Sequence, residues 1–265
     1  MIGSKHMTSR LSEGPAVETA RVLTPQLPGW KRILDLCLIL LTSPLWLPLM
    51  FLVSLLIKIV SPGPAFFCQE RVGFLGRRFI CFKFRTMQVN ADTGVHQGHL
   101  SRLMDSNLPM MKLDSSDPRL IPAGLLLRSL GLDELPQLFN VLRGEMSLVG
   151  PRPCLPYEYA NYAPRHRRRF EAVPGLTGLW QVSGKNMTTF EEMIDLDVDY
   201  ATRQSLWLDL AIILKTVPAI ISQTKQLNEE SRPVFQNAAL MIAPQCLKNH
   251  SNNHALVTNT YERSH

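Results

Sequence analysis

The longest apolar run of the chain lies near its start. Between Ile33 and Val60 only Asp35 and Lys58 are charged, so the run is long enough to reach deep into a bilayer. Basic residues lie on both sides of it, including Lys31 before the run. Because positive charge marks the cytoplasmic side of a membrane segment, this distribution favours a helix that enters and leaves by the same face. A single kinked span is the alternative.

Prolines interrupt the middle of this run. Pro44 and Pro48 each remove a helical hydrogen bond, at a cost of about 3 kcal/mol inside a helix. We therefore expect a re-entrant membrane helix over residues 30–61 that is broken at Ser43 and Pro44, unless the hydroxyl groups of Thr42 and Ser43 satisfy the freed carbonyls.

Alternating apolar and polar positions follow. Residues 65–72 (AFFCQERV) and 78–87 (RFICFKFRTM), separated by a GFLGR turn, predict a β-hairpin with an aromatic face. Residues 88–117 are polar and aperiodic, which predicts a loop that could lie over a site. Apolar residues at helical spacing predict a helix from about Leu132 that stops at Gly144.

Two more helices are predicted towards the carboxyl end. Residues 190–204 form an acidic amphipathic pattern, and residues 205–224 read as an amphipathic or buried helix. The pattern therefore predicts an α/β (α+β, helix-rich) fold that is associated with a membrane and contains a hairpin and amphipathic interfacial helices. The expected organisation is an N-terminal tail over 1–29, the membrane helix over 30–61, a domain over 62–225 that carries the candidate catalytic residues, and a polar tail over 226–265.

Composition adds to this picture. The chain has 265 residues, of which 45% are hydrophobic and 19% charged, against about 25% charged in an ordinary soluble domain. Disordered chains, disulfide scaffolds and multi-pass transporters are excluded. The five cysteines are scattered, which favours a reducing compartment. The net charge is +6, and the basic cluster at 165–169 (RHRRR) is expected to be a solvated face or to contact anionic headgroups or a lipid phosphate.

Charged residues of both signs gather around the predicted helix start at Asp133 and Glu134. Arg128 precedes this pair, and Arg152 lies in a rigid Gly-Pro-Arg-Pro turn behind it. Carboxylates bind Mg²⁺ through oxygen and arginine forks neutralise phosphate, so the group suits chemistry on a metal-bound diphosphate. One carboxylate could also attack phosphorus directly. The alternative is that the acidic pair only caps a helix.

Lys83 and Arg85 end the second strand of the predicted hairpin. They fit phosphate contacts or the solvated face of a strand about equally well. The acidic residue Asp209 lies in the predicted helix at 205–224. Nucleic acid is not expected as a partner, because no binding motif accompanies the basic residues.

Taken together, these motifs resemble the bacterial sugar transferase family, the small monotopic polyprenyl-phosphate phosphoglycosyltransferases. The resemblance covers about residues 30–222. It rests on the segments KRILDL, SPLWLP, PGPAFFCQERVG, FKFRTM, RSLGLDELPQLFNVLRGEMSLVGPRP, PGLTGLWQVSGK and SLWLDLAIILKT. The resemblance implies a re-entrant helix in the cytoplasmic leaflet of the bacterial inner membrane, with the catalytic domain facing the cytoplasm. It also implies transfer of a sugar-1-phosphate from a UDP-sugar to undecaprenyl phosphate.

The same resemblance implies roles for individual residues. Asp133 would be the nucleophile on the sugar-linked phosphate, and Glu134 would help to hold Mg²⁺ or manage protons. The basic positions of the family's site match Lys83, Arg128 and Arg152. Asp209 matches a further acidic position, which we group with the expected phosphate site.

Two rival functions stay open on the sequence. One is direct metal-dependent transfer without a covalent step, and the other is a non-catalytic membrane-anchored scaffold. The sugar, the pathway (capsule, exopolysaccharide, lipopolysaccharide or glycoprotein) and the oligomeric state, with a homodimer as one option, are not specified.

Overall fold

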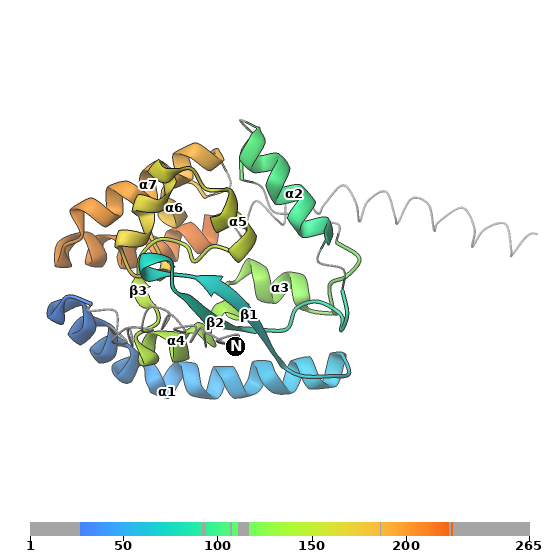
Figure 1. Cartoon of the computed structure of the whole chain (residues 1–265). Coiled ribbons are helices and arrows are strands. Elements are labelled where there is room, and N and C mark those ends of the chain that lie inside the picture. The colour runs from blue at the N-terminus through green and yellow to red at the C-terminus, as the bar shows by residue number, and fades with distance from the viewer. Residues whose placement is uncertain are drawn as a thin grey trace, which may run out of the picture.

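A computed structural model describes residues 27–91, 94–106, 108–110, 117–185, 187–222 and 224. The polar tail at 226–265 and nearly all of the tail at 1–29 lie outside these ranges. The first element is the long helix α1, Gly29–Val60. In Figure 1 it runs along one edge of the molecule, and the remaining elements lie on one side of it.

Helix α1 continues through its prolines, so the predicted interruption at Ser43–Pro44 is wrong. The Ser43 hydroxyl donates to the carbonyl of Leu40, at 2.8 Å, which is the acceptor that the missing N–H of Pro44 leaves free. The Thr42 hydroxyl also donates to a carbonyl of the preceding turn, that of Leu38, at 2.7 Å. These bonds preserve the helix, and its direction changes between the dark-blue first arm and the lighter second arm in Figure 1.

The predicted β-hairpin is confirmed. Strands β1, Phe66–Val72, and β2, Arg78–Phe84, are antiparallel, with Gln69 opposite Cys81 and Arg71 opposite Phe79. A short 3-10 turn, η1 (Phe74–Gly76), joins them, and Leu75 there adopts the left-handed conformation with φ 52°.

Short helices and a second small sheet complete the globular part (Figure 1). The acidic helix predicted at 190–204 is confirmed, and a further helix spans 206–222. In chain order the elements are α2 (Gly94–Asp105), α3 (Gly124–Ser129), η3 (Leu132–Glu134), α4 (Gln137–Arg143), β3 (Ser147–Val149), α5 (Pro156–Asn161), η4 (Pro164–Glu171), β4 (Gly175–Thr177), α6 (Leu179–Val182) and α7 (Phe190–Arg203).

Helix α2 corrects the loop predicted over 88–117. Leu100 and Leu103 of α2 are buried and belong to the same hydrophobic cluster as Phe190 and Met193 of α7. This packing stabilises a helix that its own polar sequence does not favour, since most helical stability comes from tertiary contacts.

Both ends of α1 are fastened to the globular part. At the first turn, the buried Lys31 forms an ion pair with Asp209 of the helix at 206–222. Just past the last turn, Ser61 accepts a hydrogen bond from Arg85, at 2.9 Å. Between these points one face of α1 is buried in the main core through Ile39, Trp46, Met50, Val53 and Ile57.

The opposite face of α1 is apolar and exposed. It carries Leu40, Leu41, Leu45, Leu47, Phe51, Leu52 and Ile59. The helix at 206–222 adds Trp207, Leu214, Val217 and Ile221 to the exposed apolar residues. By length and composition α1 is long and apolar enough to cross a membrane. A soluble chain rarely leaves so large an apolar surface uncovered, which suggests membrane association.

Candidate active site

The acidic pair lies in the 3-10 turn η3, immediately before α4. Gly131 precedes η3 with φ 68°, a conformation that favours glycine, and α4 ends at Gly144 with φ 77°, as predicted. Asp133 is 8% exposed, and Glu134 reaches the Lys83 amino group of β2, with 3.0 Å between Oε1 and Nζ. The predicted site residues Lys83 and Glu134 are therefore in direct contact.

The hairpin and α4 are locked together next to this pair. The buried Asn140 of α4 accepts a hydrogen bond from the Phe82 backbone at 3.0 Å and donates to the Ile80 carbonyl at 2.6 Å. A side-chain amide thus satisfies two backbone groups on β2. This contact fixes the position of Lys83 relative to the acidic turn.

Arg152 is held by a tightly packed turn. A Cβ atom on Gly150 would lie 2.2 Å from the carbonyl oxygen of Val173, so only glycine fits there. The side chain of Arg152 lies 3.4 Å from the carboxylate of the buried Glu158. Burial opposes ionisation of Glu158, but the charges of Arg152 and Arg71 outweigh it and lower the pKa of Glu158 below its ordinary value.

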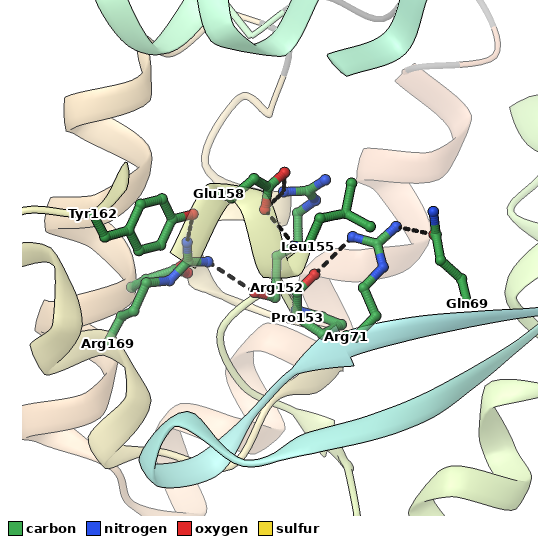
Figure 2. A network of polar contacts seen from close by, with 9 residues as sticks. Gln69, Arg71, Arg152, Pro153, Leu155, Glu158, Tyr162 and Arg169 are labelled. Atoms are coloured by element: carbon green, nitrogen blue, oxygen red, sulfur yellow. Dashed lines mark hydrogen bonds and ion pairs between the residues drawn. The ribbon is translucent and has the colours of Figure 1, made fainter. Parts of the chain in front are cut away.

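The basic cluster at 165–169 does not form a uniformly solvated face. Arg169 is fully buried: it forms an ion pair with Asp197 and donates to the Tyr162 hydroxyl at 2.8 Å and to the Arg152 carbonyl at 2.9 Å (Figure 2). Arg165 and Arg168 are exposed. Arg169 therefore supports the turn that carries Arg152.

A polar cavity brings most of the predicted site residues together. Its lining includes six basic side chains (Arg71, Lys83, Arg119, Arg128, Arg152 and Lys185) and three acidic ones (Asp117, Asp133 and Glu134). The formal excess of three positive charges suits an anionic ligand. His99 and Leu100 of α2 also line it, so α2 forms one wall of this cavity.

Two predicted phosphate-binding residues do not line this cavity. Arg85 is buried and uses its guanidinium to bind the chain after α1, through Pro64 and Ser61. Asp209 is buried in contact with Lys31 and the Tyr200 hydroxyl. Both residues join distant segments of the chain instead of facing the acidic turn.

Conversely, sequence reasoning missed residues that do line the cavity, namely Arg71, His99, Arg119, Trp180, Gln181 and Lys185. Arg71 carried a signal that could have found it: it shares a strand face with Cys81 and Lys83 in the hairpin register, and both of those line the cavity.

A second, largely apolar cavity adjoins the polar one at the acidic turn. Its apolar lining includes Leu38 and Ile39 of α1, Leu130, Leu132, Leu135 and Leu138 near the acidic turn, Ile213, Val217 and Ile220 of the helix at 206–222, and Leu148, Leu176 and Val182 of β3, β4 and α6. Arg128, Asp133, Glu134, Leu176, Gln181 and Lys185 line both cavities. A polar and an apolar compartment therefore meet at Asp133 and Glu134.

The residues at this junction fit a magnesium ion. Mg²⁺ is typically bound by one or two carboxylates, with substrate phosphates and water completing its octahedral shell. The carboxylates of Asp133 and Glu134 supply such donors. Among the described residues no cluster of three or more acidic, histidine or cysteine side chains forms a larger ligand set. The remaining ligands would therefore come from substrate and water.

Comparison with known proteins shows the family of this chain. The family model described as bacterial sugar transferase matches residues 27–223. The chain belongs to the bacterial sugar transferase family. This match includes α1, the acidic turn and both cavities, so the whole of the described site lies within the family region.

Several curated members of the bacterial sugar transferase family are similar to this chain. The exopolysaccharide production protein ExoY of Sinorhizobium fredii is 40% identical over 72% of this chain and 84% of its own length. The UDP-glucose:undecaprenyl-phosphate glucose-1-phosphate transferase of Caulobacter vibrioides is 40% identical over 72% of this chain and 70% of its own. The galactosyl transferase CpsE of Streptococcus agalactiae is 45% identical over 61% of this chain, and the match spans only 36% of CpsE.

Proposed function

We propose that this protein transfers a sugar-1-phosphate from a UDP-sugar to undecaprenyl phosphate, at the start of exopolysaccharide, capsule or related glycoconjugate synthesis. The observation that carries this proposal is the meeting of the two cavities at Asp133 and Glu134. A nucleotide sugar is polar and anionic, whereas the acceptor joins a phosphate to a long hydrocarbon chain. The reaction needs a place for each beside one reactive group.

The basic cavity suits the donor. Its excess positive charge offsets the negative charge of a diphosphate, and arginine forks orient phosphate oxygens. Lys83 lies within hydrogen-bond distance of Glu134, so its amino group is next to the acidic turn where the diphosphate would be cleaved. A bound Mg²⁺ held by Asp133 and Glu134 would neutralise phosphate charge and polarise the phosphorus.

The apolar cavity suits the acceptor. It lies between α1 and the helix at 206–222, the two elements whose outer surfaces are apolar and exposed. In this proposal a polyprenyl chain enters the cavity from the membrane, and its phosphate binds near Arg128, which lines both cavities. This arrangement explains why the site is built against α1.

The proposed chemistry has two steps. A carboxylate oxygen of Asp133 attacks the sugar-linked phosphorus, the bond from that phosphorus to the bridging oxygen breaks, and UMP leaves with the electron pair. A phosphate oxygen of undecaprenyl phosphate then attacks the same phosphorus. The acyl-phosphate bond breaks, Asp133 regains its carboxylate, and undecaprenyl-diphosphate-sugar is the product.

The docking of α1 supports a proposal for its membrane geometry. Its first turn binds Asp209 and its end binds Arg85, and both partners belong to one globular part. A helix that crossed the bilayer would separate these two anchoring points by about 30 Å of hydrocarbon. We infer a re-entrant helix at the inner membrane, with the catalytic domain in the cytoplasm.

The proposal is tested by a panel of nucleotide sugars, with release of UMP measured in the presence and absence of undecaprenyl phosphate. The substitution Asp133→Asn should abolish turnover, and Asp195→Asn, at an exposed carboxylate of α7, should not. Trapping of a labelled sugar-phosphate on the protein without lipid distinguishes the covalent route from direct transfer. Full turnover by Asp133→Asn would rule out the covalent role.

A further inference from the structure

Arg71 is a buried guanidinium whose hydrogen-bonding capacity is only partly used. It lies near the end of β1 and is 7% exposed. Its Nη1 donates to the Pro153 carbonyl at 3.0 Å and its Nη2 to Gln69 at 2.6 Å. The Nε–H of Arg71 is buried and has no hydrogen-bond partner among the described residues. A buried donor of this kind is costly unless a ligand or water satisfies it.

The charge around Arg71 is unbalanced. Both of its hydrogen bonds go to neutral oxygens, and Glu158, the acidic residue nearest in the network, already contacts Arg152. Arg169 is neutralised separately by Asp197. Two guanidinium groups therefore share one carboxylate, which leaves a formal excess of one positive charge. Burial and the neighbouring charge of Arg152 lower the pKa of Arg71, so an anion bound here would be stabilised.

The hairpin register shows where this charge lies relative to the acidic turn. Lys83, Cys81 and Phe79 alternate along one face of β2, and Phe79 is opposite Arg71. Each step of two residues advances about 7 Å, so the row of Arg71 lies about 14 Å along the hairpin from the row of Lys83. Lys83 and Arg71 both line the polar cavity. The cavity lining therefore includes Lys83 and Glu134 towards the open end of the hairpin and Arg71 towards its turn end.

Figure 2 shows Arg71 and Arg152 together. The side chains of Arg71 and Arg152 extend in the same direction away from the hairpin, and Pro153 lies between their backbones. The Pro153 carbonyl that holds Arg71 belongs to the residue next to Arg152. The two guanidinium groups are thus fixed by the same short segment of chain.

We propose that Arg71, together with Arg152, binds the nucleotide-side phosphate of the donor, the group that leaves as a nucleoside monophosphate. This inference rests on the proposed function and adds to it a further binding residue and the orientation of the bound donor. The sugar-linked phosphate is next to Asp133, and the nucleotide-side phosphate is next to Arg71. When Asp133 attacks the sugar-linked phosphorus, the electron pair of the broken bond goes to the oxygen of the leaving monophosphate. Two guanidinium groups there stabilise the charge that this oxygen gains.

The test measures binding of UMP and of UDP by calorimetry to the full chain in lipid nanodiscs. Arg71→Gln should weaken the binding of UMP and of UDP at least tenfold. Arg71→Lys keeps a charge but loses the fork, and should weaken both about fivefold. The control is Arg78→Gln, an exposed residue of the same hairpin paired with Glu70, which should change neither affinity by more than twofold.

The outcomes separate the two proposals. If Arg71→Gln does not keep the thermal midpoint of the parent protein, Arg71→Lys decides the result. Unchanged UMP affinity in the folded variant would overturn the inference, even where UDP affinity falls, because that pattern assigns Arg71 to the sugar-side phosphate. The proposed function fails on a different observation: UMP and UDP bind the parent protein, but no nucleotide sugar yields UMP with undecaprenyl phosphate.

Discussion

Lys31 and Asp209 form a buried ion pair that joins the first turn of α1 to the helix at 206–222. The two residues are 178 positions apart in the chain, and both are almost fully buried. The Tyr200 hydroxyl donates to Asp209 at 2.7 Å and accepts from Lys31 at 2.8 Å, so the pair is surrounded by further hydrogen bonds. Asp209 therefore has a structural role, although its match to the family had grouped it with the expected phosphate site.

Replacing Asp209 should reduce stability and leave substrate affinity unchanged. Asp209→Asn removes the carboxylate that contacts Lys31 directly and leaves this buried charge with only the weaker interaction with Asp35, so we expect a loss of stability of about 3 kcal/mol. The measurement is the free energy of unfolding in detergent, together with the KM for the UDP-sugar. The double variant Lys31→Met with Asp209→Leu should recover much of the loss, because both charges are gone. A raised KM for the UDP-sugar in a variant of unchanged stability would instead indicate that Asp209 takes part in phosphate binding.

Local pattern was enough to predict much of this fold. Alternation over 65–87 predicted the hairpin, because a strand exposes every second residue to the same side. Gly144 ended its helix as expected, since the left-handed conformation there favours glycine. The acidic turn and the Gly-Pro-Arg-Pro turn reach the same cavity, as the combination of metal-binding and phosphate-binding residue types suggested.

What local pattern could not supply was the partner of each charged side chain. Arg85 was predicted as a site residue because it ends the hairpin strand beside Lys83, and Asp209 because it matches an acidic position of the family. Both instead bind α1 or the chain just after it. Similarly, α2 was expected to be a loop, because its helix depends on the burial of Leu100 and Leu103. The break at Ser43–Pro44 was predicted from the missing N–H, but hydroxyl groups on the same helix compensate for it.

The apolar cavity predicts a substitution that acts on one substrate only. Val217 lines this cavity and does not line the polar one. Val217→Asp places a charge beside the acceptor's hydrocarbon chain and should raise the KM for undecaprenyl phosphate about tenfold, equivalent to about 1.4 kcal/mol. The KM for the UDP-sugar should stay within twofold. Val217→Leu is the matched control and should change neither value. The measurement is steady-state kinetics in mixed micelles, with each substrate varied in turn. An equal rise in both KM values for Val217→Asp would contradict separate compartments.

The docking of both α1 ends on one globular part predicts the topology of the chain in cells. Cysteines introduced at Pro28 and Pro62, two exposed positions that flank α1, should both be protected from an impermeant maleimide added outside spheroplasts. Both should react after lysis. The background replaces Cys37, Cys68 and Cys246 with serine, because the first two are exposed and the third lies in the tail. External labelling of one site alone would establish a crossing helix in place of the re-entrant one.

The carboxylate of Glu158 should make the protein sensitive to acid. The charges of Arg152 and Arg71 overcome the effect of burial and lower the pKa of Glu158 below its ordinary 4.5, so the folded chain binds this proton more weakly than the unfolded chain does. The group therefore stabilises the fold above about pH 4.5, and this contribution is lost as pH falls through the folded-state pKa. Thermal midpoints between pH 3 and pH 7 should fall steeply in acid for the parent. Glu158→Gln should have a lower thermal midpoint than the parent at pH 7, and its midpoint should fall less between pH 7 and pH 3. Glu171→Gln, at an exposed residue, should follow the parent curve. A Glu158→Gln curve parallel to the parent would show that the Arg152 contact does not hold this carboxylate in its charged form.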